Sequence, residues 1–319
     1  MTEMIATRAA YGEALARLGD VNPSVVVLDA DLSASTRTAE FARRHPERFI
    51  QMGIAEQDMI GTAAGLAASG KVAFASTFAV FASGRAFDQV RNAVCYSRLN
   101  VKICATHAGL TVGEDGASHQ SVEDIALMRA VPNMTVIVPS DAVQTAWAVN
   151  AAAAMDGPVY MRLGRAPVPV IHGEGQEFAI GKAHTMRMGS DVTIIACGIM
   201  VPRALAAAEA LSEEGISARV LDMHTVKPLD VDAVRAAADD TGAIVTAEEH
   251  SIIGGLGGAV CEAVCESHAA PVVRVGVRDV FGRSGKPDEL LAAYGLTTEE
   301  IVKAARRAMS VKTAVARSI

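Results

Sequence analysis

Short apolar runs alternate with longer Ala-rich stretches along the first half of the chain. The runs expected to form strands are residues 25–28, 72–76, 101–106, 135–138 and 159–162. The stretches expected to form helices between them include residues 55–68, 84–95, 121–130 and 143–155. Continuously apolar strands separated by helices are typical of a parallel sheet that is covered on both faces. We therefore predict an α/β domain over residues 1–165.

The alternation is lost over residues 166–190, whose prolines, glycines and scattered polar residues we interpret as a linker. It resumes over residues 191–319. The expected strands there are residues 191–197, 218–222, 243–248 and 272–275, and the expected helices are 202–213, 230–239, 257–265 and 298–309. The predicted fold class is α/β, with two domains that each contain a mostly parallel sheet covered by helices.

Composition narrows the class of protein. Half of the 319 residues are hydrophobic, which is enough for buried cores and excludes an intrinsically disordered chain. The formal net charge is −7 and Lys and Arg do not cluster, so we expect no nucleic-acid partner. The most apolar stretch, residues 65–84, is interrupted by Lys71 and by Gly and Ser. We therefore expect no membrane span.

The cysteines and the N-terminus indicate the compartment. The chain contains five cysteines, which are Cys95, Cys104, Cys197, Cys261 and Cys265. They form no CxxC pair and no spacing typical of metal ligands, so we interpret them as free thiols in a reducing compartment. The first residues lack a basic segment followed by an apolar core, and no secretory signal is expected. The expected location is the cytoplasm.

Two short motifs follow expected strands. Gly53-Ile54-Ala55-Glu56-Gln57-Asp58 places Glu56 in a first helical turn, at the sheet edge where ligands usually bind. An acid in this position could equally stabilise the helix through its dipole. In Ser76-Thr77-Phe78-Ala79-Val80-Phe81, two of only eight Phe residues lie three apart. Phe78 and Phe81 could form a wall for a planar ring, or they could be ordinary core residues.

Residues 106–120 carry the strongest functional signal. They read Thr-His-Ala-Gly-Leu-Thr-Val-Gly-Glu-Asp-Gly-Ala-Ser-His-Gln. Three glycines permit positive φ angles and close backbone approach, which suits a loop wrapped over a ligand. His107, Asp115 and His119 could bind hydroxyl groups and transfer protons. By contrast, Gly254-Gly255-Leu256-Gly257-Gly258 matches no nucleotide-binding motif, and we interpret it as tight packing at a helix start.

In this order, the three stretches resemble the C-terminal half of transketolase, a thiamine diphosphate enzyme. The resemblance covers almost the whole chain, as a pyrimidine-binding domain followed by the transketolase C-terminal domain. It implies that Glu56 contacts N1′ of the cofactor aminopyrimidine, that Phe78 and Phe81 pack against that ring, and that Asp31 also contacts the cofactor. The family has a further aromatic residue where this chain has Gly84.

The resemblance also implies the substrate side of the site. His107, Asp115 and His119 match positions that contact the sugar, with His107 and His119 as catalytic candidates. A sugar phosphate is expected at Arg8, Ser35 and Arg162. Two of these have simpler interpretations, since Arg8 could be a solvated helix charge and Ser35 a helix cap.

One family motif is missing. The family binds Mg²⁺ and the diphosphate through a GDG motif and a later Asn, and no GDG occurs in this sequence. The resemblance therefore implies the C-terminal subunit of a split transketolase, with no metal ligand of its own. A separate N-terminal subunit would hold most of the diphosphate and Mg²⁺ site, with two copies of each chain in the assembly. The expected reaction transfers a two-carbon ketol unit from a ketose phosphate to an aldose.

Three alternatives stay open. A 1-deoxyxylulose-5-phosphate synthase shares the opening of the loop at Thr106, although Val-Gly-Glu-Asp-Gly is closer to transketolase. The β subunit of a 2-oxo acid dehydrogenase has a similar length, but it should lack the arrangement of Asp115 and His119. A non-catalytic assembly or regulatory subunit could keep the fold, but packing alone would not select this set of residues.

Overall fold

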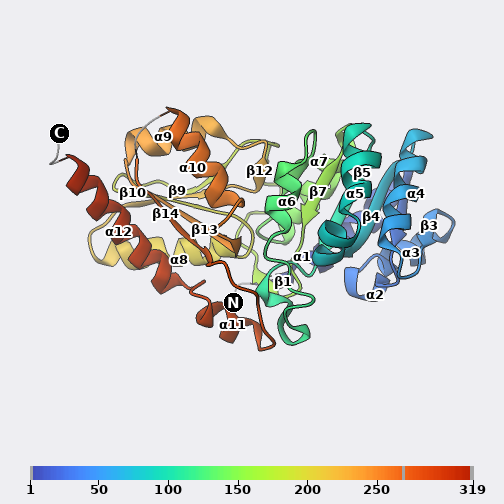
Figure 1. Cartoon of the computed structure of the whole chain (residues 1–319), viewed down its shortest axis with the longest axis horizontal. Coiled ribbons are helices and arrows are strands. Elements are labelled where there is room, and N and C mark those ends of the chain that lie inside the picture. Colours follow the sequence, from blue (N-terminus) through green and yellow to red (C-terminus); the bar gives the residue numbers. More distant parts are fainter. Residues whose placement is uncertain (1–2, 268–269, 317–319) are drawn as a thin grey trace.

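The computed structural model describes residues 3–267 and 270–316. Two α/β domains lie side by side in it, one built from the first half of the chain and the other from most of the second half (Figure 1). Each has a mostly parallel sheet with helices on both faces, so the predicted fold class is confirmed.

Within the described residues, the first domain contains a seven-stranded sheet. From edge to edge its strands are β12 (Thr225–Lys227), β6 (Thr135–Ile137), β7 (Val159–Arg162), β5 (Val101–Thr106), β4 (Val72–Phe78), β2 (Val25–Asp29) and β3 (Phe49–Gln51). Neighbouring strands are parallel except β12 and β6, which are antiparallel. Because β12 comes from the second half of the chain, this edge of the sheet ties the two domains together.

Helices cover both faces of this sheet. They are α1 (Thr7–Val21), α2 (Ser33–Thr36), α3 (Ala39–Arg44), α4 (Glu56–Ala68), α5 (Phe87–Gln89), α6 (Asp124–Ala130) and α7 (Ala142–Ala154), with a short 3₁₀ turn, η1 (Pro46–Arg48). Strand side chains alternate between faces. In β2, Val25 and Val27 join the core under α1, α3 and α7, whereas Val26 and Leu28 join the core under α4 and α6.

One predicted helix of this domain is wrong. Residues 84–95 do not form a regular α-helix, because two π-helical segments, η2 (Phe81–Arg85) and η3 (Val90–Tyr96), flank α5. A π-helical turn holds more residues than an α-helical turn and is frequent at functional sites. Hydrophobic periodicity does not distinguish the two over so short a segment.

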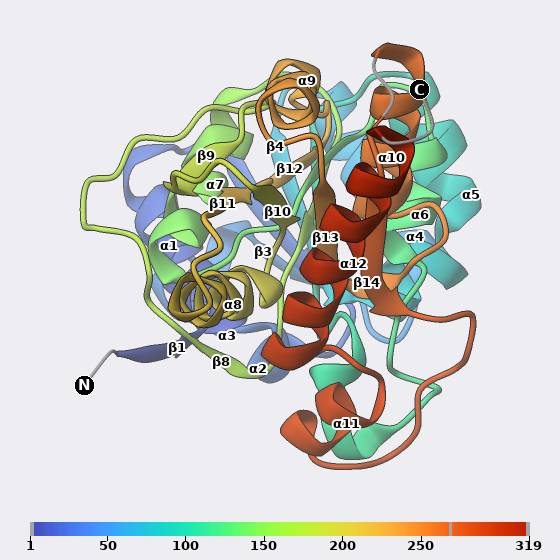
Figure 2. The same ribbon diagram turned by 90° about the vertical axis from the view of Figure 1, so that its left-hand side faces the viewer.

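In the described part of the second domain the sheet has five strands. They are, in order, β14 (Val272–Val277), β13 (Ile244–Ser251), β10 (Val192–Ala196), β11 (Ala218–Asp222) and β9 (His184–Arg187), and only β9 is antiparallel to its neighbour. The helices are α8 (Met200–Glu213), α9 (Val231–Asp240), α10 (Leu256–Ser267), α11 (Pro287–Ala293) and α12 (Thr298–Ala316). Helices α8 and α12 cover one face and α9 and α10 the other (Figure 2).

The segment interpreted as a linker also contains two short strands. β8 (Pro167–Pro169) pairs antiparallel with β1 (Met4–Ala6), and β9 joins the second sheet. Neither strand was expected, because their partners are remote in the sequence and their own composition is that of a turn. This segment is therefore hydrogen-bonded to both halves of the molecule.

A buried arginine joins the two domains. Arg162, the last residue of β7, is 6% exposed. Its Nε donates to Oδ2 of Asp124 at 2.9 Å, and its Nη2 donates to the backbone oxygen of Glu249 at 2.9 Å. Tyr160 Oη donates to the same carboxylate oxygen of Asp124. A strand and a helix of the first domain are thereby fixed to β13 of the second.

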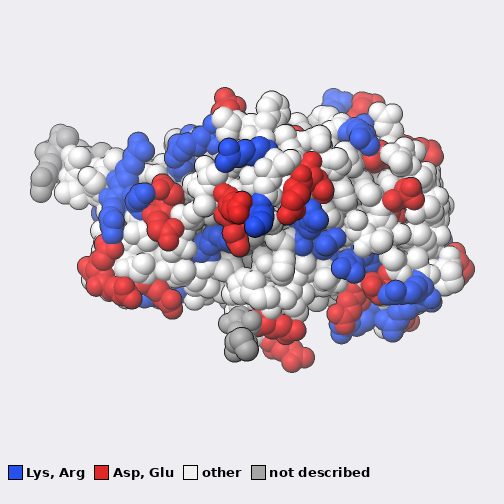
Figure 3. Space-filling view, turned by 90° about the horizontal axis from the view of Figure 1, so that it is seen from below, with Lys and Arg blue, Asp and Glu red and all other residues white. Residues whose placement is uncertain are grey.

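Two surface properties bear on partners. Among the described residues, no helix is long and apolar enough to cross a lipid bilayer. On the face shown in Figure 3, Lys and Arg side chains are interspersed with Asp and Glu. This face therefore presents no extended surface of one sign.

We predict that Arg162→Met lowers the free energy of unfolding by about 3–5 kcal/mol, because it leaves the buried carboxylate of Asp124 without its charged partner. Urea denaturation measures the change. Arg235 is an exposed arginine on α9, and Arg235→Met should change stability by less than about 0.5 kcal/mol. Equal effects of the two substitutions would contradict a structural role for Arg162.

Candidate active site

The predicted site residues follow successive strands of one parallel sheet. Asp29 at the end of β2 pairs with Ser76 in β4, and Phe78 at the end of β4 pairs with Thr106 at the end of β5. The segments that leave these strands therefore start from the same edge. They carry Asp31 and Ser35 after β2, Glu56 after β3, Phe81 after β4 and His107 after β5.

Glu56 is the first residue of α4 and is only 4% exposed. Its Oε1 accepts a hydrogen bond from Nη1 of Arg85 at 3.0 Å. The carboxylate also lies at the helix N-terminus, so the helix dipole stabilises its charge. The structure therefore shows a buried acceptor at the sheet edge, and the dipole interpretation is compatible with a functional one.

Four rings lie together beside Glu56's helix. Phe78 and Phe81 lie 5.8 Å apart between centroids, with their planes inclined by 16°. The His107 ring stacks on Phe78 at 3.9 Å, and His119 presents its edge to Phe81 at 5.4 Å. The structure thus brings the aromatic motif and the histidines of the 106–120 loop into one group.

Arg85 is a site residue that the sequence analysis did not identify. Its guanidinium carbon lies 3.9 Å from the centroid of the Phe81 ring, in a cation–π arrangement. The neighbouring Gly84 is exposed, with no atom within 4 Å of the position that a Cβ would take. Residue 84 therefore contributes no aromatic side chain, and the guanidinium of Arg85 lies over the Phe81 ring instead.

His107 is held in a buried, electropositive position. It has a φ of 57° and is 3% exposed, and its Nδ1 lies 2.9 Å from Oγ1 of Thr106. Its Nε2 lies 3.4 Å from Nη1 of Arg8. Burial, followed by the charges of Arg8 and Arg165, lowers the pKa of His107 to about 3. The imidazole is therefore neutral at pH 7.

Arginines gather beside this imidazole. Nη1 of Arg8 donates to the backbone oxygen of Ser35 at 2.7 Å. Arg165 donates to Oδ2 of Asp115 at 3.3 Å and to the backbone oxygen of Val112. Burial, followed by the charges of Arg37 and Arg165, lowers the pKa of Arg8. A concentration of positive charge of this kind suits an anionic group.

The structure does not bring Arg162 to this group. Arg162 is the last residue of β7, and its side-chain donors are used at the domain interface described above. Arg165 lies beyond the end of the strand, is 35% exposed, and is close enough to His107 for its charge to act on that imidazole. The sequence contained a signal for Arg165. The predicted strand ends at residue 162, and a residue just beyond a strand end lies at the sheet edge where ligands bind.

Asp31 and Asp115 are the exposed acids of the site. Asp31 has a φ of 62°, and its backbone N–H donates to Oε1 of Gln51 at 2.8 Å. The loop that carries it is fixed by Asp29, whose carboxylate accepts from Thr36, Thr38 and the backbone of Leu32. Asp115 is 42% exposed beside Arg165. Both side chains are accessible to a ligand.

Residues of the second domain contact and position the 106–120 loop. The central part of this loop is the 3₁₀ segment η4 (Leu110–Asp115), which packs against α11. Oε1 of the buried Glu249 accepts from the backbone N–H of Thr111 at 2.6 Å. Gly109 has a φ of 80°, and a Cβ there would lie 2.3 Å from Cδ of Glu249. Only glycine therefore allows the carboxylate so close.

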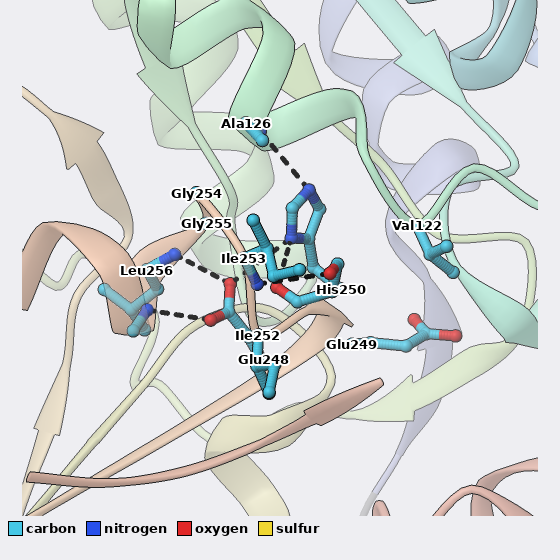
Figure 4. A network of polar contacts seen from close by, with 12 residues as sticks. Val122, Ala126, Glu248, Glu249, His250, Ile252, Ile253, Gly254, Gly255 and Leu256 are labelled. Atoms are coloured by element: carbon cyan, nitrogen blue, oxygen red, sulfur yellow. Dashed lines mark hydrogen bonds and ion pairs between the residues drawn. The ribbon is translucent and has the colours of Figure 1, made fainter. Parts of the chain in front are cut away.

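The glycine-rich segment lies next to this anchor. Glu248 and Glu249 point in different directions from β13 (Figure 4). Oε2 and Oε1 of Glu248 accept from the backbone N–H groups of Leu256 and Gly257, each at 2.7 Å. A Cβ on Gly255 would lie 2.1 Å from Oε2 of Glu248. The interpretation as tight packing at a helix start is confirmed.

Known families match both domains. The family described as "Transketolase, pyrimidine binding domain" matches residues 3–170, and "Transketolase, C-terminal domain" matches residues 181–301. A putative transketolase C-terminal section from Methanocaldococcus jannaschii is 54% identical over 299 residues, which cover 93% of this chain and 94% of that protein. A 6-deoxy-6-sulfo-D-fructose transketolase subunit from Clostridium sp. (strain MSTE9) is 48% identical over 298 residues, 93% of this chain and 92% of that one.

A solved structure matches equally well. It is described as a split-gene transketolase in an inactive beta4 tetramer, and it superposes with a TM-score of 0.91 at 56% identity. The match covers 97% of this chain and 99% of that one. The fold and the site define a member of the thiamine diphosphate-dependent enzymes. Within them, the chain belongs to the transketolase family, and it corresponds to the family's C-terminal section.

The residues present fit the aminopyrimidine ring of the cofactor that this family implies. Glu56 is a buried acceptor, and the Phe81 ring already accommodates a planar group that donates N–H bonds, the guanidinium of Arg85. For the metal of the diphosphate, no group of three or more His, Cys, Asp or Glu is placed to bind a cation in the part of the chain that the structure describes.

We predict that His107 makes stability depend on pH below about 6.5. The folded-state pKa of about 3 lies below the ordinary value of 6.5, so the unfolded chain binds the proton first. This group's contribution is complete above pH 6.5 and falls with pH toward 3, by at most about 1.4 kcal/mol per pH unit. Urea denaturation between pH 5 and 7 should show a shallower slope for His107→Asn than for the wild type, and equal slopes would refute the assignment.

Proposed function

We propose that this chain is the C-terminal subunit of a two-chain transketolase, which transfers a two-carbon ketol unit from a ketose phosphate to an aldose. The observation that carries the proposal is the meeting of Glu56, the Phe78–Phe81 wall and the His107–His119 loop at one sheet edge. When bound, thiamine diphosphate supplies the nucleophilic carbon for cleavage and formation of the carbon–carbon bond.

The residues of this chain have separate tasks in the proposal. Glu56 holds a proton at N1′ of the aminopyrimidine, and Phe78 and Phe81 orient that ring. Asp31 contacts the cofactor from the loop after β2. His107 stays neutral at working pH, and because Thr106 occupies its Nδ1, its Nε2 can accept a hydrogen bond from a hydroxyl or take up a proton. Asp115 and His119 recognise sugar hydroxyls from the exposed rim.

The phosphate of the sugar binds among the arginines. Arg8 and Arg165 converge near His107, and Ser35, whose backbone oxygen accepts from Arg8, could add its hydroxyl. Guanidinium groups bind phosphate oxygens through two parallel hydrogen bonds, which fixes orientation as well as charge. We assign this role to Arg165 in place of Arg162.

A partner subunit completes the site. We propose that a separate N-terminal chain provides the diphosphate and Mg²⁺ site, with two copies of each chain in the working assembly. The description of the similar split-gene protein as an inactive tetramer of one chain supports this dependence.

We also propose a cytoplasmic location, which five free cysteines support.

The substrates are a further question. The Clostridium relative is named for a sulfonated sugar, so the donor and the acceptor can differ between chains of this kind. The names of the matched families and relatives favour transketolase over 1-deoxyxylulose-5-phosphate synthase and over a 2-oxo acid dehydrogenase. The non-catalytic alternative is decided by the assay below.

We predict ketol transfer when this chain, its N-terminal partner, thiamine diphosphate and Mg²⁺ are mixed, and none from this chain alone. Glu56→Gln should lower kcat of the mixture by about 100-fold or more, because the amide cannot share the proton. Asp58→Asn is the matched control, since Asp58 is an exposed acid in the same helical turn. It removes a similar dipole interaction and should leave kcat within about twofold.

Three results would contradict this proposal. Activity of the isolated chain would refute the split enzyme. Equal effects of Glu56→Gln and Asp58→Asn would reduce Glu56 to a helix-dipole residue. No ketol transfer by any mixture, over a panel of ketose phosphates that includes a sulfonated ketose, would favour the non-catalytic alternative.

We further predict that Arg165→Met raises KM for a ketose phosphate by about tenfold or more, because it removes a charged hydrogen bond to phosphate. KM for an unphosphorylated ketose should change little, so the comparison of the two donors with the same variant serves as the control. Steady-state kinetics of the two-chain mixture provide both values. A similar increase for both donors would show that Arg165 positions the loop through Asp115 rather than binding phosphate.

A further inference from the structure

The guanidinium of Arg85 makes two contacts at the same time. It donates a hydrogen bond to the buried carboxylate of Glu56 at 3.0 Å, and its central carbon lies over the Phe81 ring, 3.9 Å from the centroid. Glu56 is 4% exposed, whereas the Arg85 side chain is 51% exposed. The arginine therefore covers two buried or half-buried groups from the solvent side.

These contacts have the same chemistry as those of an aminopyrimidine. Both groups are flat and delocalised, and both stack on aromatic rings. Both also hydrogen-bond a carboxyl group, the guanidinium by donating an N–H and the aminopyrimidine through the proton shared with N1′. The proposed function gives the cofactor ring a hydrogen bond to Glu56 and a stacking contact with Phe81. Arg85 already occupies both of these contacts, the hydrogen bond to Glu56 and the place over the Phe81 ring. The ring of the cofactor and the guanidinium therefore compete for one place.

The local backbone allows the side chain to leave without rearrangement of the fold. The backbone oxygen of Arg85 accepts from Nε2 of Gln57 at 3.0 Å, so the main chain is tied to the start of α4. Gly84 adds no side chain, and the space around its Cβ position is open. Rotation of an exposed side chain then costs only the two contacts that it makes.

We propose that Arg85 is an internal competitor for the cofactor's aminopyrimidine and thereby sets the affinity of the subunit for thiamine diphosphate. The proposal rests on the proposed function. In the chain without cofactor, Arg85 pairs with Glu56 and covers Phe81. The cofactor binds only the fraction of molecules in which Arg85 has turned away, so the apparent Kd equals the intrinsic Kd divided by that fraction.

The test is calorimetric titration of thiamine diphosphate, with Mg²⁺ present, into the complex of this chain with its N-terminal partner. Arg85→Ala should lower the Kd by about three- to tenfold, since an exposed ion pair and a cation–π contact are each weak. Stopped-flow measurement should show that most of this gain lies in the association rate. Arg85→Lys keeps the charge but not the flat group, and its Kd should lie between the two.

Arg91 supplies the matched control. It is an exposed arginine in η3 that contacts Asn92, so Arg91→Ala removes the same charge from the same region. Its Kd should equal that of the wild type. A higher or unchanged Kd in Arg85→Ala would overturn the proposal, because Arg85 would then be part of the cofactor wall or a bystander.

Glu56→Gln separates this outcome from failure of the proposed function. If the wild-type complex binds thiamine diphosphate and Glu56→Gln weakens binding, the cofactor site stands, and the Arg85→Ala result alone decides the competitor. If the wild-type complex does not bind thiamine diphosphate, the proposed function and the competitor are both overturned.

Discussion

The arrangement of the site depends on one buried polar contact between the domains. Arg162 is fixed by Asp124 and by the backbone of Glu249, and the carboxylate of Glu249 in turn holds the backbone of Thr111. Burial raises the pKa of Glu249, while the Arg162 charge and the Thr111 N–H oppose that shift. Removal of Arg162 or of Asp124 would leave the other as an unpaired buried charge. These groups therefore fix the position of β7 relative to β13 and to the 106–120 loop. The second domain thereby acts on a loop that belongs to the first.

The site itself combines two kinds of surface. The inner part, around Phe78 and Phe81, is apolar and has Glu56 as its buried acceptor. The outer part, around Arg8 and Arg165, is positive, and burial together with these charges lowers the pKa of His107 and keeps it neutral. A flat heterocycle and an anionic sugar therefore have separate places, and the rings of His107 and His119 lie where the two surfaces meet.

Much of the fold and part of the site could be predicted from local pattern. The alternation of apolar strands and Ala-rich helices led to the two-domain α/β architecture, and strand ends located Glu56, Phe78, Phe81 and His107 at one edge. The short strands β1, β8, β9 and β12 were not foreseen, because each is only three or four residues long and pairs with a remote segment. The π-helical segments η2 and η3 were not foreseen either, because over so few residues their hydrophobic pattern does not differ from that of an α-helix.

The sequence by itself determined the fold class, the family resemblance and the motifs that bring carboxylate, aromatic and imidazole groups to one sheet edge, since these depend on residues close together in the chain. Only the tertiary structure decided that Arg165 rather than Arg162 faces the site, that Arg85 covers Phe81, and that Glu249 holds a loop 138 residues before it. The reason is physical. Whether an arginine is buried or free depends on which acceptors the folded chain places around it, and those acceptors come from segments that local pattern does not connect.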